Sequence, residues 1–332
     1  ITGEQAFAQL GVTPFVNLMV TGSEARELYK DGLLAGISLD GTQDLLLDET
    51  TQWIQADRFR RPQTTRRWTP SLVDATTGAG TTVAIIDSGV DIDHPAFQRN
   101  GTSIIVDGAC FEDCDGQETE SANVEEISAA NHCSIAERTG CDHGTHVAGI
   151  VAGQSTSVPG GLRMPAGVAP GANVAAYRAC SPGVDGADLV VNCQRSSMIE
   201  ALGRTVTQAA ANNIVAANLS ILSPNSLATC SAADSLPSPA FASAVGAATA
   251  ANISVVLGNG NGGRTAFASC DPTAIVVANV DKRGVAHESS DFHPDRTTLW
   301  APGADIMSAE VSRLDGVDRP WVRSQTGTSM AA

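Results

Sequence analysis

The chain has 332 residues, with 20 basic and 36 acidic side chains and a formal net charge of −16. This length allows one large domain or a large and a small one. Nucleic acid and anionic membranes bind basic protein surfaces, so this acidic chain is not expected to have either as a partner. The longest uncharged stretch, 239–263, predicts a buried helix followed by a strand, so no membrane anchor is expected.

Residues 1–55 predict a small α+β unit. A strand-like run at 15–20 precedes a helix-like run at 23–34, which opens on Ser23 with acidic residues in its first turn. Residues 35–47 are expected to be extended. Because the chain starts without a basic segment followed by an apolar one, we expect that a signal peptide has been removed.

Residues 56–70 are predicted to be a linker, because they concentrate arginines in an otherwise acidic chain. The arginines are Arg58, Arg60, Arg61, Arg66 and Arg67. The linker is either a maturation site or an exposed connector that is not processed.

Residues 71–332 predict one large α/β domain. The predicted strands end at Asp87 and span 174–178, 214–220, 254–257 and 274–280, and the predicted helices begin at Gly144 and span 198–212 and 239–252. Such alternation is typical of a parallel β-sheet with helices on both faces.

The last eight residues read Q-T-G-T-S-M-A-A and offer Ser329 as a nucleophile. A serine hydroxyl needs a base to take its proton and a third group to orient that base. Only three residues follow Ser329, so both partners must lie upstream. The segment also lacks the second Gly of a G-x-S-x-G elbow. The expected chain order is therefore acid, base, serine.

Two upstream stretches supply these partners. The run T-V-A-I-I-D-S-G at 82–89 is apolar and β-branched up to a carboxylate, as a buried parallel strand is when it delivers Asp87 to its carboxyl end. Ligands of open α/β sheets gather at that edge. The run C-D-H-G-T-H-V-A-G from Cys141 puts His143 at the start of a helix. His143 is the predicted base and Asp87 its orienting acid.

Metal binding is the alternative use of these residue types. Zinc would use His143 and His146, but no Glu follows His143 as in H-E-x-x-H, so His146 is predicted to be a packed helix residue. The acidic insertion at 107–140 suits calcium, although it fails the EF-hand pattern, and a disulfide-tied surface loop is its other interpretation. No metal ligands are assigned.

Three segments carry a resemblance to a known family: D-S-G at Asp87, H-G-T-H-V-A-G from His143 and G-T-S-M-A at Ser329. In sequence and order they resemble the subtilisin-like serine proteases, or subtilases, over roughly residues 69–332. The resemblance implies a subtilisin-like α/β fold and a serine endopeptidase in which His143 deprotonates Ser329 and Asp87 holds the imidazole. It also implies protein or peptide substrates, no cofactor for catalysis, and structural calcium as a family feature.

The same resemblance bears on both ends of the chain. Residues 1–55 resemble part of the inhibitory propeptide that precedes many subtilase domains, which would make this unit a partner of the domain at 71–332. An ordinary N-terminal extension is the alternative. The family continues its nucleophile helix beyond the point reached by Ala332, so the resemblance implies a fragment of a longer protein.

The resemblance also places an oxyanion donor and a substrate-binding segment. Asn259, in a glycine-rich turn after a strand, is the predicted side-chain donor beside the N–H of Ser329, with Asn261 as its rival and turn chemistry as the other interpretation.

Ser220, Ile221 and Leu222 lie in A-N-L-S-I-L-S-P, which resembles the segment that pairs with a bound peptide. Leu222 stands where the family has Gly, which predicts a narrowed or reshaped pocket.

Eight cysteines, none in C-x-x-C spacing, predict four disulfides and an oxidising compartment, with buried free thiols as the alternative. Proximity pairs Cys180 with Cys193, and the resemblance implies Cys230 with Cys270. Cys110, Cys114, Cys133 and Cys141 would pair among themselves in an order left open. The protein is thus expected to be secreted, extracellular or periplasmic, and monomeric.

Two rivals to the protease remain. One is a non-catalytic secreted interaction domain on a subtilase fold, because fold does not imply activity. The other is a metal-binding, disulfide-rich module.

Overall fold

The structure is a computed structural model that describes residues 8–9, 16–17, 30, 46–56, 76–112, 114, 126–131, 141–185, 188–221, 239–263, 272–314 and 317–332. The chain divides into two compact units, Ile1–Asp44 and Leu45–Ala332. In the first unit, β1 (Ala8–Gln9) pairs antiparallel with β2 (Val16–Asn17). β2 lies inside the strand predicted at 15–20, whereas β1 was not predicted. Most of the predicted helix at 23–34 and of the linker at 56–70 lies outside the described residues, so these predictions, and the propeptide interpretation, stay predictions.

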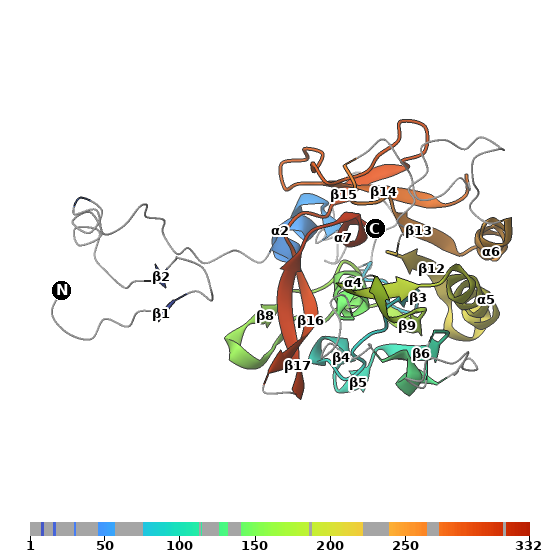
Figure 1. Ribbon diagram of the computed structural model, residues 1–332. Helices are drawn as coiled ribbons and strands as arrows, with labels where there is room; N and C mark the ends of the chain where they lie inside the picture. The colour runs from blue at the N-terminus through green and yellow to red at the C-terminus, as the bar shows by residue number, and fades with distance from the viewer. Residues whose placement is uncertain are drawn as a thin grey trace, which may run out of the picture. The chain divides into compact units, whose positions relative to one another are not determined.

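A seven-stranded parallel sheet forms the centre of the larger unit (Figure 1). Its strands, in spatial order, are β15 (Leu299–Pro302), β14 (Ile275–Val280), β13 (Ser254–Gly258), β12 (Ile214–Leu219), β3 (Thr82–Asp87), β9 (Asn173–Arg178) and β6 (Ile105–Cys110). Each neighbouring pair is parallel. The predicted α/β fold class is therefore confirmed.

Strand β3 lies between β12 and β9, which cover both of its edges. Its two faces are covered by the two clusters of core residues. Five of its six residues are buried, including Asp87. An interior strand of a parallel sheet is apolar along its whole length because no face meets water. The run T-V-A-I-I meets this requirement and brings the only ionisable residue of β3 to the carboxyl edge of the sheet.

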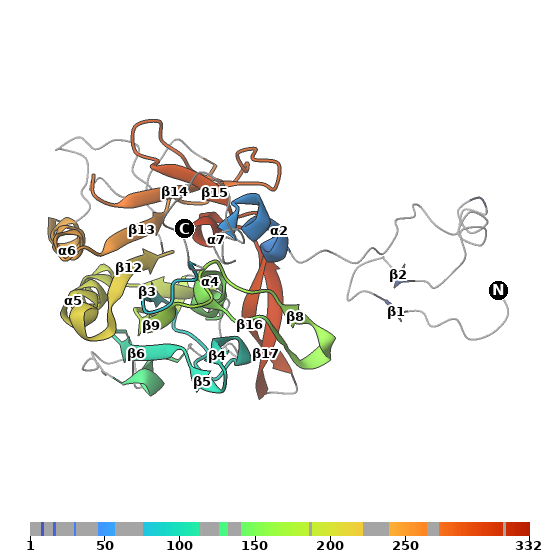
Figure 2. The same ribbon diagram turned by 180° about the vertical axis from the view of Figure 1, so that it is seen from behind.

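Two helical layers cover the sheet. Helices α5 (Arg195–Asn212) and α6 (Pro239–Ala250) pack on one face, where Leu202 and Val245 meet Ala84 and Ile86. Helix α4 (His143–Ala152) packs on the other face, and Figures 1 and 2 show it on the side of the sheet away from α5 and α6.

A long antiparallel hairpin, β16 (Ile306–Leu314) and β17 (Val317–Gln325), lies against α4. The hydroxyl of Ser308 donates to the carbonyl oxygen of His146 at 2.7 Å. Nε2 of His146 donates to the carbonyl oxygen of Arg323 at 3.1 Å, and a side chain on Gly149 would overlap Ser308. The hairpin therefore fixes the position of the helix that begins at His143.

Helix α2 (Leu46–Trp53) packs on β16. The prediction of extended chain up to residue 47 is wrong for its last two residues. Leu46, Thr50 and Trp53 recur at helical spacing, and this periodicity outweighs the short apolar run that indicated a strand.

The remaining short elements connect the main layers. They are η1 (Pro95–Phe97), β4 (Gln98–Arg99), β5 (Thr102–Ser103), η2 (Ile127–Ala130), β7 (Thr156–Ser157), η3 (Pro159–Gly161), β8 (Arg163–Met164), β10 (Cys180–Asp185), β11 (Asp188–Cys193) and α7 (Thr328–Ala331). No helix in the described part of the chain is both long and apolar enough to cross a membrane.

Disulfides join described cysteines at two places. Cys180 bonds to Cys193 across the β10–β11 hairpin, which confirms the pairing predicted from proximity. Cys110 bonds to Cys114, one of the pairings that the sequence left open, and Cys141 is also disulfide-bonded. The other three, Cys133, Cys230 and Cys270, lie outside the described residues.

Candidate active site

Asp87 is held at the carboxyl edge of the sheet by two donors. Its buried Oδ1 accepts hydrogen bonds from the backbone N–H of Ser88 at 2.7 Å and from Nδ1 of His143 at 2.8 Å. Oδ2 is buried and has no hydrogen-bond partner within the described ranges. A carboxylate only accepts, so Nδ1 of His143 carries the proton. Asp87 thereby selects the tautomer that leaves Nε2 as a proton acceptor.

The start of α4 fits closely against the turn after β3. The hydroxyl of Ser88 donates to the carbonyl oxygen of Cys141 at 3.2 Å and accepts from the backbone N–H of Gly144 at 3.1 Å. A Cβ on Gly144 would overlap the carbonyl oxygen of Gly89. Only glycine therefore allows helix and turn to approach closely enough for the hydrogen bond between His143 and Asp87.

The surroundings of His143 favour its charged form. Burial lowers the pKa of the imidazole, whereas the charge of Asp87, the hydrogen bond to Asp87 and the charge of Asp142 raise it, and the net effect is a raised pKa. A neighbouring carboxylate stabilises an imidazolium most when the two are hydrogen-bonded. The site thus stabilises the cation that forms when His143 takes up a proton.

Ser329 lies in the short helix α7, which contacts α4 and the ends of β13, β14 and β15. Its hydroxyl donates to the carbonyl oxygen of Ser220 at 2.9 Å, and the Ser220 hydroxyl donates to the carbonyl oxygen of Ser329 at 3.0 Å. In the described part of the chain, the Ser329 hydroxyl is hydrogen-bonded to Ser220 and not to His143. The structure thus joins Asp87 to His143 and Ser329 to Ser220 as two separate pairs.

The glycine-rich turn after β13 separates the two candidate asparagines. The side-chain amide of Asn259 donates to the carbonyl oxygen of Asp291 at 2.7 Å and to Oγ1 of Thr297 at 3.2 Å, and the residue is fully buried. The amide thus donates to two residues other than Ser329. Among the described residues no hydrogen bond joins Asn259 to Ser329, and the oxyanion role of Asn259 stays a prediction.

Asn261 faces α7 instead. Its Oδ1 accepts from the backbone N–H of Thr328 at 2.9 Å and from Oγ1 of Thr328 at 3.2 Å. Its Nδ2 lies alongside Gly327 and makes no hydrogen bond to any residue that the structure describes. The rival asparagine thus presents a free donor next to the nucleophile.

Asp291 orders this turn and gave no signal in the sequence. It is fully buried, and its Oδ1 accepts from the N–H of Gly262 at 3.1 Å. A side chain on Gly260, which has a φ of +124°, would overlap the Asp291 carboxylate. No local motif marks such a contact, because Asp291 follows the turn by about thirty residues.

The predicted substrate-binding segment is described only in part. Ser220 follows β12 directly and is buried beside Ser329, and Ile221 is half-buried. Leu222 lies outside the described residues, so the prediction of a narrowed pocket stays a prediction.

The other histidines near the site have structural partners. Nδ1 of His94 accepts from the N–H of Ala96 at 3.0 Å, and its Nε2 donates to the carbonyl oxygen of Trp321 at 3.1 Å. The ring of His146 donates a hydrogen bond to the β16–β17 hairpin through Nε2. Within the described ranges, no three His, Cys, Asp or Glu side chains gather as metal ligands would. Much of the acidic insertion lies outside these ranges, so structural calcium stays a prediction.

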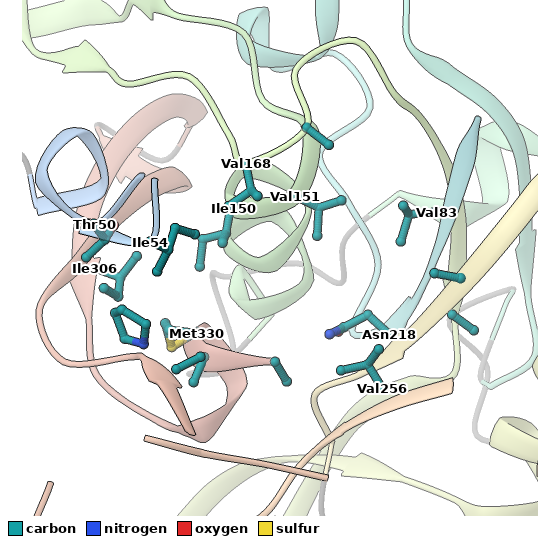
Figure 3. A pocket seen from close by; sticks show the side chains of 17 residues that line it. Thr50, Ile54, Val83, Ile150, Val151, Val168, Asn218, Val256, Ile306 and Met330 are labelled. Atoms are coloured by element: carbon teal, nitrogen blue, oxygen red, sulfur yellow. The ribbon is translucent and has the colours of Figure 1, made fainter. Parts of the chain in front are cut away.

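A largely apolar cavity of about 320 Å³ lies next to α7, the helix that contains Ser329 (Figure 3). Val83, Ile150, Val256, Ile306 and Met330 are among its lining residues, and no lining side chain ionises. Asn218 also lines it, with an Nδ2 that is buried and lacks a described partner while Oδ1 accepts from the Ser220 hydroxyl. The cavity thus borders the Ser220–Ser329 pair but supplies no acid or base.

An aspartate hydrogen-bonded to a histidine at the carboxyl edge of a parallel sheet, with a serine on a short helix that contacts the helix of that histidine, is typical of serine peptidase sites. The profile described as "Subtilase family" (peptidase S8) matches residues 78–332. The chain therefore belongs to the subtilase family, as its three motifs predicted.

Curated relatives agree with this assignment. An extracellular protease of Xanthomonas campestris pv. campestris is 29% identical over 270 residues, which are 78% of this chain and 43% of that protein. Subtilisin-like protease 3 of Arthroderma benhamiae is 28% identical over 78% of this chain and 51% of its own length. The chain thus spans about half the length of these relatives.

Solved structures share the fold. A cold-adapted subtilisin-like serine proteinase superposes with a TM-score of 0.51 at 23% identity, over 83% of this chain and 79% of the other. A protease from Pseudoalteromonas arctica gives 0.56 at 20% identity, over 77% and 75%. These likenesses support the subtilisin-like fold.

Proposed function

We propose that the chain is the catalytic part of a secreted serine endopeptidase that cleaves peptide bonds through an acyl-enzyme. The observation that carries the proposal is the 2.8 Å hydrogen bond between Asp87 and His143, formed where the central strand ends and next to the helix of Ser329. A buried carboxylate that orients an imidazole beside a serine is the arrangement that activates a hydroxyl.

In the reaction, the Ser329 hydroxyl turns from the carbonyl of Ser220 towards Nε2 of His143, a rotation about one side-chain bond. His143 takes the proton as Oγ attacks the substrate carbonyl carbon, and the negative charge of Asp87 stabilises the imidazolium. The imidazolium then protonates the leaving amine. Water repeats the sequence on the acyl-enzyme and frees Ser329.

The oxyanion of the tetrahedral intermediate is proposed to lie between the backbone N–H of Ser329 and the amide of Asn261. The Ser329 N–H belongs to the first turn of α7, where helix N–H groups have no intrahelical acceptor. Asn261 replaces Asn259 in this role because its Oδ1 is anchored on Thr328 while its Nδ2 is free. Asn259 is instead proposed to hold the turn.

The substrate is proposed to bind as an extended peptide along the backbone of Ser220, Ile221 and Leu222. Secretion is supported by the description of the Xanthomonas relative as extracellular and by the disulfides in the chain. An N-terminal propeptide within residues 1–55, a monomeric state and structural calcium complete the proposal.

The test is covalent labelling of the full chain with a fluorophosphonate probe, with the adduct located by peptide mass spectrometry. The proposal expects an adduct on Ser329 that is lost in His143→Ala and kept in His287→Ala, a matched change at a histidine outside the site. A folded protein that takes up no probe would instead support the non-catalytic interaction domain.

A further inference from the structure

Two side-chain hydrogen bonds join the start of α4 to the end of β17. Nε2 of His146 donates to the carbonyl oxygen of Arg323 at 3.1 Å. Nε2 of Gln325 donates in the opposite direction, to Oδ2 of Asp142, at 3.3 Å. The candidate base His143 lies between the two helix positions in the sequence. The segment that carries the base is therefore attached to the strand on both sides.

The spacing of the two bonds fits the geometry of both elements. Asp142 and His146 lie four residues apart at the start of a helix, which is about 6 Å along its axis. Arg323 and Gln325 lie two residues apart at the end of β17, which is about 6.6 Å along the strand. One contact would leave the helix free to turn about it, whereas two contacts fix its direction as well. The two bonds thus form a helix–strand clamp.

The strand side of this clamp leads directly to the nucleophile. Gln325 is the last residue of β17, and only Thr326 and Gly327 separate it from α7, in which Ser329 lies. The N–H of Gly327 donates to the carbonyl oxygen of Gly303 at 2.9 Å. A connection this short, fixed at one end of α7, transmits a displacement of the strand end to the nucleophile.

We propose that Asp142 and Gln325 are positioning residues for the peptidase reaction. Their hydrogen bond is the second point of the helix–strand clamp, which sets the distance between the base and the nucleophile. The inference rests on the proposed roles of His143 and Ser329. The Ser329 hydroxyl leaves the carbonyl of Ser220 by rotation about one bond, so it reaches the imidazole only if the two backbones are already correctly spaced. A misplacement of about 1 Å can lower the rate by about 10²-fold.

The test uses the full chain and the variant Gln325→Ala, which removes the donor. We expect kcat for a chromogenic peptide to fall about tenfold or more, with KM near that of the parent, because neither clamp residue lies in the proposed substrate-binding segment. The rate at which the fluorophosphonate probe labels Ser329 should fall by the same factor. Asp142→Ala should have the same effect, and the double variant should lose no more than either single variant, because both changes remove one interaction.

Asp142→Asn separates position from charge. The asparagine oxygen still accepts from Gln325, so kcat on the plateau of the pH profile should stay near the parent value. The charges of Asp87 and Asp142 both raise the pKa of His143, while His146 is neutral because burial lowers its pKa to about 3. Loss of one of these charges should move the acidic limb of the profile to lower pH. A residue that served only folding would not separate the two effects.

Two further measurements make the result specific. Ser324→Ala is the matched control, because Ser324 directly precedes Gln325 in β17 and is exposed, and it should leave kcat and labelling unchanged. Hydrogen exchange followed by mass spectrometry needs no activity, and Gln325→Ala should speed exchange in the peptide that contains the start of α4. Should Gln325→Ala fail to fold, Gln325→Glu keeps the length of the side chain but, once ionised, cannot donate, and it should lower kcat in the same way.

An unchanged kcat in Gln325→Ala, or in the substitute Gln325→Glu, overturns the inference if the parent labels on Ser329. Additive losses in the double variant would also overturn it. The proposed function is judged separately, by probe uptake in the parent. If the folded parent takes up no probe, the peptidase fails, and the exchange result alone decides the clamp: faster exchange at the start of α4 supports it, and unchanged exchange removes it.

Discussion

At the scale of single residues, two asparagines separated by one glycine have opposite environments. Asn259 is fully buried and uses its amide to tie the turn after β13 to Asp291 and Thr297. Asn261 is exposed, anchored through its oxygen on Thr328, and its side-chain N–H groups make no hydrogen bond to a described residue. The first side chain therefore stabilises the turn, and the second is the oxyanion donor proposed above.

Asn261→Ala is expected to lower kcat by about 10²–10³ with little change in KM, because the lost donor acts mainly in the transition state. Asn259→Ala is its matched control and should chiefly lower thermal stability, since it removes the buried hydrogen bond to the carbonyl oxygen of Asp291. Steady-state kinetics and thermal unfolding of both variants make the comparison. A larger kcat loss in Asn259→Ala would return the oxyanion role to that residue.

The residue types of the site were largely predictable from the sequence. Local motifs placed Asp87 at a strand end and His143 at a helix start, and the structure joins the two by a hydrogen bond. The different environments of Asn259 and Asn261 were not predictable, because they depend on Asp291, which belongs to a distant loop.

At the scale of elements, hydrogen bonds join the start of α4 to the turn after β3. The Ser88 hydroxyl is hydrogen-bonded to Cys141 and to Gly144, which lie on either side of His143 in the sequence. The hydroxyl of Thr145 accepts from the N–H of Asp91 at 2.8 Å. The absence of a side chain at Gly144 makes this contact possible. The angle between helix and strand, and not only the identity of two residues, therefore sets the Asp87–His143 distance.

Gly144→Ala is expected to destabilise the protein by about 1–3 kcal/mol through overpacking against Gly89 and to lower kcat at least tenfold through displacement of His143. Gly203→Ala is the control. Gly203 lies in α5 with open space around it, so alanine there should be neutral or stabilising by up to about 1 kcal/mol. Thermal unfolding and kinetics of the pair test this, and equal behaviour of the two variants would contradict it.

The regular elements of the sheet were predictable because apolar runs and helical spacing mark them directly. The strands ending at Asp87 and Val280 and the helix from Pro239 lie where expected. The β16–β17 hairpin was not among the predicted elements, although Asp315-Gly316 is a typical hairpin turn pair. Its described residues mix buried and exposed positions without a clean alternation, so the period of two that marks a one-sided strand is missing.

At the scale of the whole molecule, stability depends on protons taken up by buried groups. His146 is fully buried, and burial lowers its pKa to about 3, while the bond to Arg323 opposes this and the charges of His143 and Arg323 reinforce it. The unfolded chain takes up this proton near pH 6.5. The stabilisation from neutral His146 is therefore complete above that pH and is lost as the pH falls towards 3.

His146→Gln is expected to weaken this acid sensitivity, because glutamine can still donate to Arg323 and never takes up a proton. Between pH 7 and 5 the parent should lose up to about 2 kcal/mol more than the variant. The comparison uses the thermal midpoints of both proteins at the two pH values. Parallel pH dependence would show that His146 is protonated in the folded state.

The predicted catalytic residues lie far apart in the sequence, so they are synthesised at different times. Asp87 and His143 lie in the first half of the sequence, whereas Ser329 reaches them only when α7 docks against Ser220. Ribosomes deliver the chain from its N-terminus, so an emerging chain holds the acid and the base long before it holds the nucleophile. The proposed catalytic site is therefore complete only after α7 has been synthesised and has docked against Ser220.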